Sequence, residues 1–458
     1  MRLLRFFAYF FVLFAALDLN AMQPDSLIGN GEKVKKGLNI GALPSVLFNS
    51  DLGFQYGALA NLFDYGDGSI YPLYRYSLYG EWSRTTKGGG INQLNFDAPG
   101  LLPGNTRLTA DFSYLTQQAL DFYGFNGRSV RYNPGFEDKN SYYYTSQMFY
   151  RIERKLTRFE VSLQRPLFGK YWQILVGAAY MNFKIGEVDL EKLNKGRDED
   201  DLIPYTQSFY GKYIKWGMIG EDEADGGNVN YVRVGLIYDS RDNEANPNRG
   251  VWAEGIITMA PSFLGNESGF TKASLVLRGY KSIVKNRLTM AGRVGYQGTI
   301  GGYTPFYFQS YLLNSQVKTT NIDGLGGNRS IRGVLRNRVV GDAMLYFNAE
   351  LRYKVIRGRW LGQNFYVALS TFYDTGMVLG NIDVSYSKVN CLDVVKYFNT
   401  DKSSLPYKIL NTDMLHDGLG GGIHIAMNEN FVLAIDYARA LDSDDGESGL
   451  YVGLNWMF

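Results

Sequence analysis

The feature that most constrains the fold is an alternation of apolar and polar residues with a period of two, which recurs in short segments. In Leu345–Val355, one set of alternate positions reads Leu, Phe, Ala, Leu, Tyr, Val, and the other reads Tyr, Asn, Glu, Arg, Lys. Successive side chains of a β-strand point to opposite faces, so this period indicates strands with one apolar and one polar face. The sequence therefore predicts an all-β fold.

Sixteen segments fit this pattern, eleven before a glycine-rich stretch near residue 330 and five after it. They are Leu52–Phe63, Leu73–Ser83, Ile91–Phe96, Thr106–Leu115, Tyr142–Ile152, Phe159–Arg165, Trp172–Phe183, Val229–Asp239, Val251–Met259, Phe270–Tyr280, Leu288–Gly298, Leu345–Val355, Phe365–Tyr373, Gly418–Met427, Phe431–Ala440 and Gly449–Phe458. An even number of strands is typical of closed bacterial barrels. Leu38–Leu47 stays open between a strand and an extra inward segment, because Pro44 interrupts it and proline is confined to strand edges and ends.

The composition favours a barrel that spans a membrane. Aromatic residues make up 15% of the chain, glycine occurs 53 times and the mean hydropathy is −0.21. Apolar outer faces, polar inner faces and aromatic girdles are what a transmembrane antiparallel β-barrel needs. A secreted β-sandwich or propeller is the soluble alternative. The net charge of +2 gives no indication of nucleic-acid binding, and Cys391, the only cysteine, excludes an internal disulfide.

The chain begins with a predicted targeting segment. Arg2 and Arg5 precede an apolar run that is too short to span a bilayer, and the small residue Ala21 follows. This arrangement indicates a secretory signal peptide at residues 1–21. We then expect residues 22–36 to form a short periplasmic segment and residues 37–458 to form a barrel in the bacterial outer membrane.

The glycine-rich stretch Gly326–Val334 predicts a polar loop that folds back into the barrel lumen. Arg332 and Gly333 lie near its tip, and Glu350 and Asp374 lie on the polar faces of two strands that follow. A guanidinium offers a planar fork for carboxylates. We therefore predict that Arg332 latches the loop to Glu350 and Asp374.

Strand parity assigns the connections to the two sides of the membrane. The long links Gly186–Asn228, Thr299–Gly341 and Met377–Asp417 fall outside, and short links such as Ile283–Arg287 fall on the periplasmic side, which is the usual asymmetry. One long link, Thr116–Ser141, falls on the periplasmic side by this count. Either a strand is miscounted or this turn is unusually large.

Four motifs in the C-terminal half carry a resemblance to a known family. They are the loop sequence GGNRSIRGV; the turn with Asp239, Arg241, Asp242, Asn243, Pro247 and Gly250; the strand FYDTG at 372–376; and an ending with alternating Val452, Leu454, Trp456 and Phe458. Together they resemble the BamA/TamA family of outer-membrane assembly barrels, also called bacterial surface antigens. In that family the turn joins the eighth and ninth strands, and the ending resembles the C-terminal signal for membrane insertion. Val334 departs from the family pattern, because an aromatic residue follows RG there.

The resemblance implies that the chain assists insertion or translocation of partner proteins or lipids at the outer membrane. Its expected partners are outer-membrane lipid and other outer-membrane or periplasmic assembly proteins. The short segment before the barrel predicts that the POTRA domains of the family are lacking. A passive porin or small-solute channel and an outer-membrane enzyme are the alternative hypotheses. The sequence predicts no enzyme, cofactor or metal site, because His416 and His424 lack a nucleophile motif or a second ligand nearby.

The first prediction concerns location. The apolar strand faces have no partner within one closed sheet, so lipid must cover them. We expect the mature protein to fractionate with the outer membrane after losing Met1–Ala21, as judged by membrane fractionation and N-terminal sequencing. Recovery as a soluble periplasmic monomer without detergent would contradict the barrel.

The second prediction concerns Phe458. The resemblance assigns this residue to the insertion signal, so its deletion should give poor assembly and low outer-membrane levels, measured by immunoblotting of fractionated cells. Normal levels of the shortened chain would show that insertion does not depend on this residue.

Overall fold

The computed structural model describes most of the predicted barrel region. The described residues are 35–50, 52–71, 74–244, 246–285, 287–316, 323–360, 363–386, 388–399, 413–427, 431–454 and 456–458. The predicted signal peptide, Met1–Ala21, and residues 22–34 of the predicted periplasmic segment lie outside this range.

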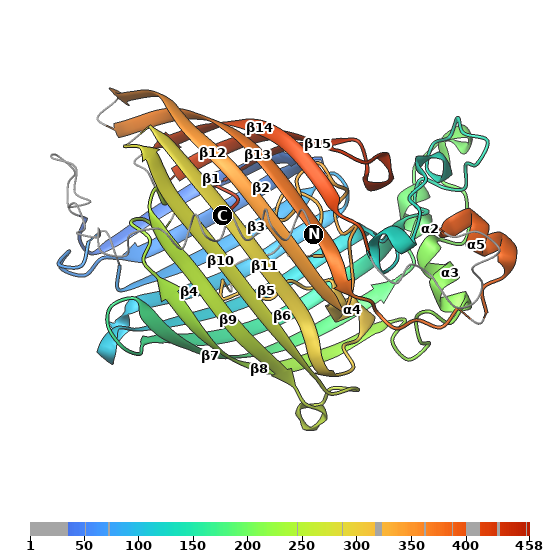
Figure 1. Cartoon of the computed structure of the whole chain (residues 1–458), viewed down its shortest axis with the longest axis horizontal. Helices are drawn as coiled ribbons and strands as arrows, with labels where there is room; N and C mark the ends of the chain where they lie inside the picture. Colours follow the sequence, from blue (N-terminus) through green and yellow to red (C-terminus); the bar gives the residue numbers. More distant parts are fainter. Residues whose placement is uncertain are drawn as a thin grey trace.

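Sixteen antiparallel strands form one closed barrel in which each strand pairs with its neighbours in sequence and β16 returns to β1 (Figure 1). The strands are β1 Leu38–Asn49, β2 Gly53–Asp64, β3 Tyr76–Thr85, β4 Gly89–Leu102, β5 Thr106–Asp121, β6 Arg151–Pro166, β7 Trp172–Gly186, β8 Gly226–Asp239, β9 Gly250–Ala260, β10 Phe270–Val284, β11 Leu288–Gly302, β12 Ala343–Trp360, β13 Gln363–Gly380, β14 His416–Met427, β15 Phe431–Ala440 and β16 Ser448–Leu454. The predicted fold class is confirmed.

The alternation in the sequence becomes an apolar outside and a polar inside. On β12, Leu351 and Tyr353 are exposed on the outer face, whereas Glu350, Arg352 and Lys354 are buried in the lumen. Several of the largest fully buried side chains in the molecule are arginines. Charged groups of this kind are buried only when they are paired, so the lumen is a packed polar interior.

The strand count is right, but one of the sixteen predicted segments is wrong, and the segment that the sequence left open is a strand. Leu38–Asn49 is a regular strand that includes Pro44. The predicted strand Tyr142–Ile152 is instead mostly a connection, and its last residues join the predicted Phe159–Arg165 in the single strand β6. The reason is that Phe149 and Tyr150 are buried in an aromatic cluster outside the sheet.

These two changes also alter the side assigned to the long link Thr116–Ser141, which the predicted strand count placed on the periplasmic side. With β1 counted, the connection between β5 and β6 joins the same end of the barrel as the connections β7–β8, β11–β12 and β13–β14. All the long connections therefore lie at one end, and the turns between β8 and β9 and between β10 and β11 lie at the other.

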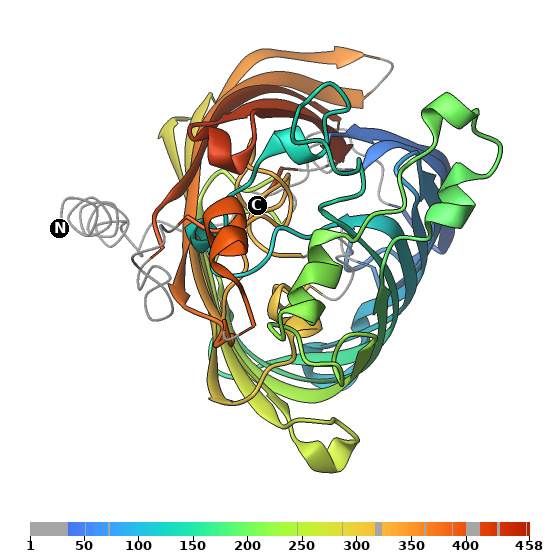
Figure 2. The ribbon, with the colours of Figure 1, turned by 90° about the vertical axis from the view of Figure 1, so that its right-hand side faces the viewer.

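The long connections form a cap over one mouth of the barrel (Figure 2). We define the cap as the described residues of 122–150, 187–225 and 381–399. Its helices are α2 Leu190–Asn194, α3 Phe209–Lys215 and α5 Cys391–Tyr397; α4 Phe306–Gln309 lies in the β11–β12 connection, and single 3-10 turns occur at η1 Pro103–Asn105, η2 Gly127–Ser129, η3 Pro134–Phe136, η4 Glu199–Asp201, η5 Ser262–Leu264 and η7 Ser443–Asp445. None of the helices within the described ranges is long and apolar enough to cross a membrane.

Aromatic rings hold the cap together. The Phe209 and Tyr213 rings of α3 lie 4.9 Å apart, and Trp216 packs on Tyr397 of α5 at 5.6 Å between ring centroids. Phe122 of the β5–β6 connection packs edge-on against Tyr213. Three connections that are distant in sequence therefore share one apolar core above the lumen.

The C-terminal segment differs from the predicted strand Gly449–Phe458. β16 ends at Leu454, and both Trp456 and Phe458 are buried. They pack on inward-facing residues of other strands, among them Tyr366 of β13 and Tyr280 of β10. The predicted strand Gly449–Phe458 is therefore too long at its C-terminal end, because the lumen offers Trp456 and Phe458 aromatic and cationic partners.

Candidate functional site

The connection between β11 and β12 enters the barrel, and we call its described residues, 303–316 and 323–342, the lumen loop. Its two arms meet at isolated bridges between Tyr311 and Asp323 and between Leu325 and Val339. At the tip, the Ser330 hydroxyl closes a tight turn by accepting from the Gly326 N–H at 2.8 Å. Asn348 Nδ2 of β12 donates to the Ser330 carbonyl at 2.6 Å. This fixes the tip against the barrel wall.

Arg332 contacts both carboxylates that the sequence suggested for it. Its Nε donates to Asp374 Oδ2 at 2.8 Å, and its Nη2 donates to Glu350 Oε2 at 3.2 Å. The backbone N–H of Arg332 donates to Asp374 as well, at 3.1 Å. The Arg332 side chain is 1% exposed, and its guanidinium lies over the Phe372 ring at 3.2 Å from the centroid. Charge, hydrogen bonds and an aromatic face thus converge on one side chain.

A third carboxylate, which the sequence analysis did not single out, completes this site. Asp436 Oδ2 of β15 lies 3.3 Å from Arg332 Nη1. The signal for it is that the other inward positions of β15 are Val432, Ala434, Ala438 and Ala440, so Asp436 is the single acid on that face. We call Arg332, Glu350, Asp374 and Asp436 the Arg332 site.

The loop approaches the wall so closely that two positions require glycine. Gly333 has a φ of 94°, and a Cβ there would lie 2.6 Å from the Arg439 carbonyl carbon. A Cβ on Gly418 of β14 would lie 1.9 Å from the Arg332 carbonyl oxygen. Val334, where the family has an aromatic residue, is buried in an apolar cluster with Leu325.

The C-terminal residues are joined to the Arg332 site by two routes. His424 Nε2 lies 3.0 Å from Asp436 Oδ1, and the His424 ring stacks on Trp456 at 3.8 Å between centroids. Arg352 donates to Glu350 at 3.2 Å and also lies over the Trp456 ring at 4.2 Å. Trp456 therefore contacts a partner of each of two carboxylates that hold Arg332.

The base of the lumen loop has its own ion pairs. Asp323 accepts from Arg154 of β6 at 2.6 and 2.9 Å and from Arg336 at 2.7 Å. Burial alone would raise the pKa of Asp323, but the two arginines lower it to about 2. Asp323 therefore stays ionised at neutral pH and anchors both arms of the loop.

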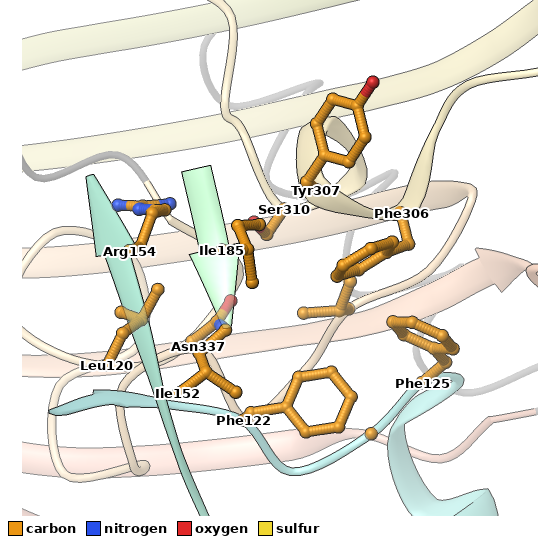
Figure 3. A pocket seen from close by; sticks show the side chains of 12 residues that line it. Leu120, Phe122, Phe125, Ile152, Arg154, Ile185, Phe306, Tyr307, Ser310 and Asn337 are labelled. Atoms are coloured by element: carbon orange, nitrogen blue, oxygen red, sulfur yellow. The ribbon is translucent and has the colours of Figure 1, made fainter. Parts of the chain in front are cut away.

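Little empty space remains between the lumen loop and the cap. A cavity of about 30 Å³ lies there, lined by Arg154 and Asn337 and by apolar side chains that include Phe122, Phe125 and Phe306 (Figure 3). This volume is of the order of a single water molecule. The lumen loop and the cap pack closely around this cavity.

A second cluster ties the lumen loop to the cap. His416 Nδ1 lies 2.7 Å from Asp445, and His416 Nε2 lies 3.2 Å from Asp413. Arg338 of the lumen loop donates to the Gly127 and Val130 carbonyls of the cap at 3.1 and 2.9 Å. Burial raises the pKa of Asp413, but its hydrogen bond and charge interaction with His416 lower it below the usual value.

The residues of the family turn motif lie between β8 and β9, at the barrel end opposite the cap. Arg241 Nε donates to Asp239 at 2.9 Å, and Asp242 Oδ1 accepts from the Asn248 N–H at 2.9 Å. Asn243 Oδ1 accepts a hydrogen bond from the Asn246 N–H within the same turn. Pro247 follows, and the turn ends at Gly250, whose φ is 104°. Lys354 of β12 donates to Asn248, so the turn reaches the lumen wall.

The structure defines the class first: a closed outer-membrane β-barrel whose lumen holds a loop bound through an arginine. Among the described residues, no group of three or more His, Cys, Asp or Glu side chains is placed to hold a metal ion. The family model of the Omp85 superfamily domain matches residues 91–458. The chain belongs to the Omp85 superfamily, and it is an integral outer-membrane protein.

Two solved structures show how far this likeness extends. The chain is 14% identical to BamA from Haemophilus ducreyi lacking POTRA domains 1–3, with a TM-score of 0.53 over 92% of this chain and 71% of that one. It is 11% identical to CdiB from Escherichia coli, with a TM-score of 0.52 over 92% of this chain and 62% of that one. At these identities the likeness concerns the fold. The curated proteins contain no match.

The contacts of Arg332 predict that this residue holds the lumen loop inside the barrel. Arg332→Glu places a fourth carboxylate among three, and breaking a paired, poorly solvated charge costs about 3–5 kcal/mol. We expect the loop to leave the lumen while the barrel survives, because the strand ladder does not use this side chain. The measurements are cleavage of the loop by external protease and a lower heat-modifiability temperature on gels.

The double variant Arg332→Glu with Asp374→Arg restores one opposite-charge pair and should recover part of the loss. Unchanged protease resistance and unchanged melting in the single variant would show that Arg332 does not latch the loop.

Proposed function

We propose that this protein assists the insertion or translocation of partner proteins or lipids at the outer membrane, and that it acts at the seam between β1 and β16. The partners would be outer-membrane lipid and other outer-membrane or periplasmic assembly proteins. The proposal rests on the family and on one observation, the shortness of the seam.

The seam is the weakest strand pairing in the barrel. Over the described residues, β1 and β16 pair through Phe48 with Val452 and Asn49 with Tyr451, and Ser50, just beyond the end of β1, adds hydrogen bonds to Leu450. By contrast, β1 pairs with β2 along its whole length, from Leu38 to Asn49. A hydrogen bond contributes about 0.5–1.5 kcal/mol net, so the seam costs far less to open than any other pairing. An opened seam would present strand edges to lipid and to an incoming chain.

A filled lumen supports this function over the porin hypothesis. The lumen loop is held through Arg332 and Asp323, and the cap covers the mouth above it. A passive channel for small solutes needs a continuous water path, which these segments obstruct. The expected single-channel trace in planar bilayers therefore shows no wide, steady conductance. A steady open pore in the unaltered protein would favour the porin instead.

The seam prediction uses a reversible lock. In a Cys391→Ser background, Phe48→Cys with Val452→Cys places two thiols at a paired position, within the range that disulfides bridge. We expect oxidation to stop proteoliposomes from accelerating the folding of a urea-unfolded outer-membrane barrel, or the transfer of a fluorescent phospholipid between leaflets. Reduction should restore the activity.

The matched control places the same pair at Ala42→Cys with Ala60→Cys, which joins β1 to β2 at paired positions. This disulfide leaves the seam free and should not inhibit. If the oxidised seam variant keeps the full activity in both assays, the seam is not the route. If the unaltered protein accelerates neither process, the proposed function is wrong.

A further inference from the structure

β1 carries a proline, Pro44, four residues before Phe48, where its pairing with β16 ends. Two hydrogen bonds fix the direction of the backbone groups near the first hairpin. Ser50 N donates to Leu450 O of β16 at 3.0 Å, and Thr86 N donates to Phe54 O of β2 at 2.9 Å. Even-numbered residues at the start of β2 therefore face β3, and even-numbered residues at the end of β1 face β16.

This direction carries along the whole of β1. The register between β1 and β2 runs from Asn49 to Leu38 without a bulge, and backbone groups of successive strand residues point to opposite edges. The N–H positions of Phe48, Val46 and Pro44 therefore all face the seam. Proline has no N–H, so the seam edge of β1 lacks a donor at residue 44.

The opposite strand leaves the sheet at the matching place. Phe48 pairs with Val452, so continued pairing would set Val46 against Leu454 and Pro44 against Trp456. β16 ends at Leu454, and Trp456 lies instead in the lumen between His424 and Arg352. β16 thus ends two residues before the residue whose carbonyl would find no donor.

We propose that Pro44 is the positioning residue that ends the seam and thereby assigns Trp456 to the lumen. This inference deepens the proposed function and rests on it for its biological meaning. The residues after Leu454 have two alternative positions. They can continue β16 and lengthen its pairing with β1, or they can lie in the lumen, where the Trp456 indole stacks on His424. A missing donor at residue 44 disfavours the first, so that no described residue pairs with the seam edge of β1 from Leu38 to Val46.

The outer face at this edge is consistent with such a role. Leu38, Ile40 and Val46 are strongly exposed, and the register places the ring of Pro44 on the same face. An unpaired edge invites pairing with any extended chain, and proline is one of the devices that limit such pairing. Pro44 thus keeps the chain's own β16 from covering the edge.

The test measures the length of the seam directly. In a Cys391→Ser background, Val46→Cys with Leu454→Cys reports the extended pairing through disulfide formation with a membrane-permeant oxidant. Adding Pro44→Ala supplies a seam-facing donor. We expect the disulfide yield at early times to rise about fivefold, which corresponds to one added hydrogen bond. Trp456→Ala should raise it further, because the lumen site no longer competes.

The pair Phe48→Cys with Val452→Cys separates an extended seam from a loosened β1. If the seam is extended, the disulfide yield of this pair stays unchanged, whereas a loosened β1 lowers it. Ala42→Pro, which removes a donor beyond the seam on the same edge, serves as the matched control and should change neither yield. An unchanged yield for Val46→Cys with Leu454→Cys in Pro44→Ala, or a fallen yield at Phe48 and Val452, overturns the proposal.

These outcomes are distinct from failure of the proposed function, because disulfide formation needs no client. A seam that lengthens in Pro44→Ala without any change in barrel folding or lipid transfer would support the role of Pro44 and contradict the function proposed for the seam.

Discussion

One buried guanidinium organises the lumen. Arg332 carries its charge at any relevant pH, and it is placed where almost no water reaches it. Such a group is tolerated only with ionic partners and satisfied hydrogen bonds. Carboxylates from β12, β13 and β15 supply them. The lumen loop, the glycines that let it approach the wall and the strands around it are all arranged to satisfy this one charge.

The sequence predicted Glu350 and Asp374 as partners of Arg332, because the alternation of side chains along a strand is enough to place both on the inward face. Because side chains alternate along a strand, Glu350 and Asp374 had to share the inward side of neighbouring strands. Asp436 was missed because its role depends on how far the loop reaches across the barrel wall. That reach depends on the register between strands and on the close approach at Gly333 and Gly418, and a local pattern contains neither.

One wrongly assigned strand and one segment that the sequence left open cancelled in the total. Pro44 hid a genuine strand, since proline normally interrupts a sheet, whereas here its missing donor faces the edge with the fewest bonds. Tyr142–Tyr150 imitated a strand because its aromatic residues suit the cap as well as a membrane interface. Aromatic content indicates burial, and it does not distinguish burial in lipid from burial beneath a loop. The long link Thr116–Ser141 on the periplasmic side was the sign that one strand had been omitted before it and one wrongly added after it.

The latch and the seam share a physical connection. Asp436 contacts both Arg332 and His424, and the His424 ring stacks on Trp456. Glu350 contacts both Arg332 and Arg352, and the Arg352 guanidinium lies over the same Trp456 ring. Trp456 follows β16, the strand that closes the seam. The two carboxylates that the C-terminal residues reach through His424 and Arg352 are therefore two of the three that hold Arg332.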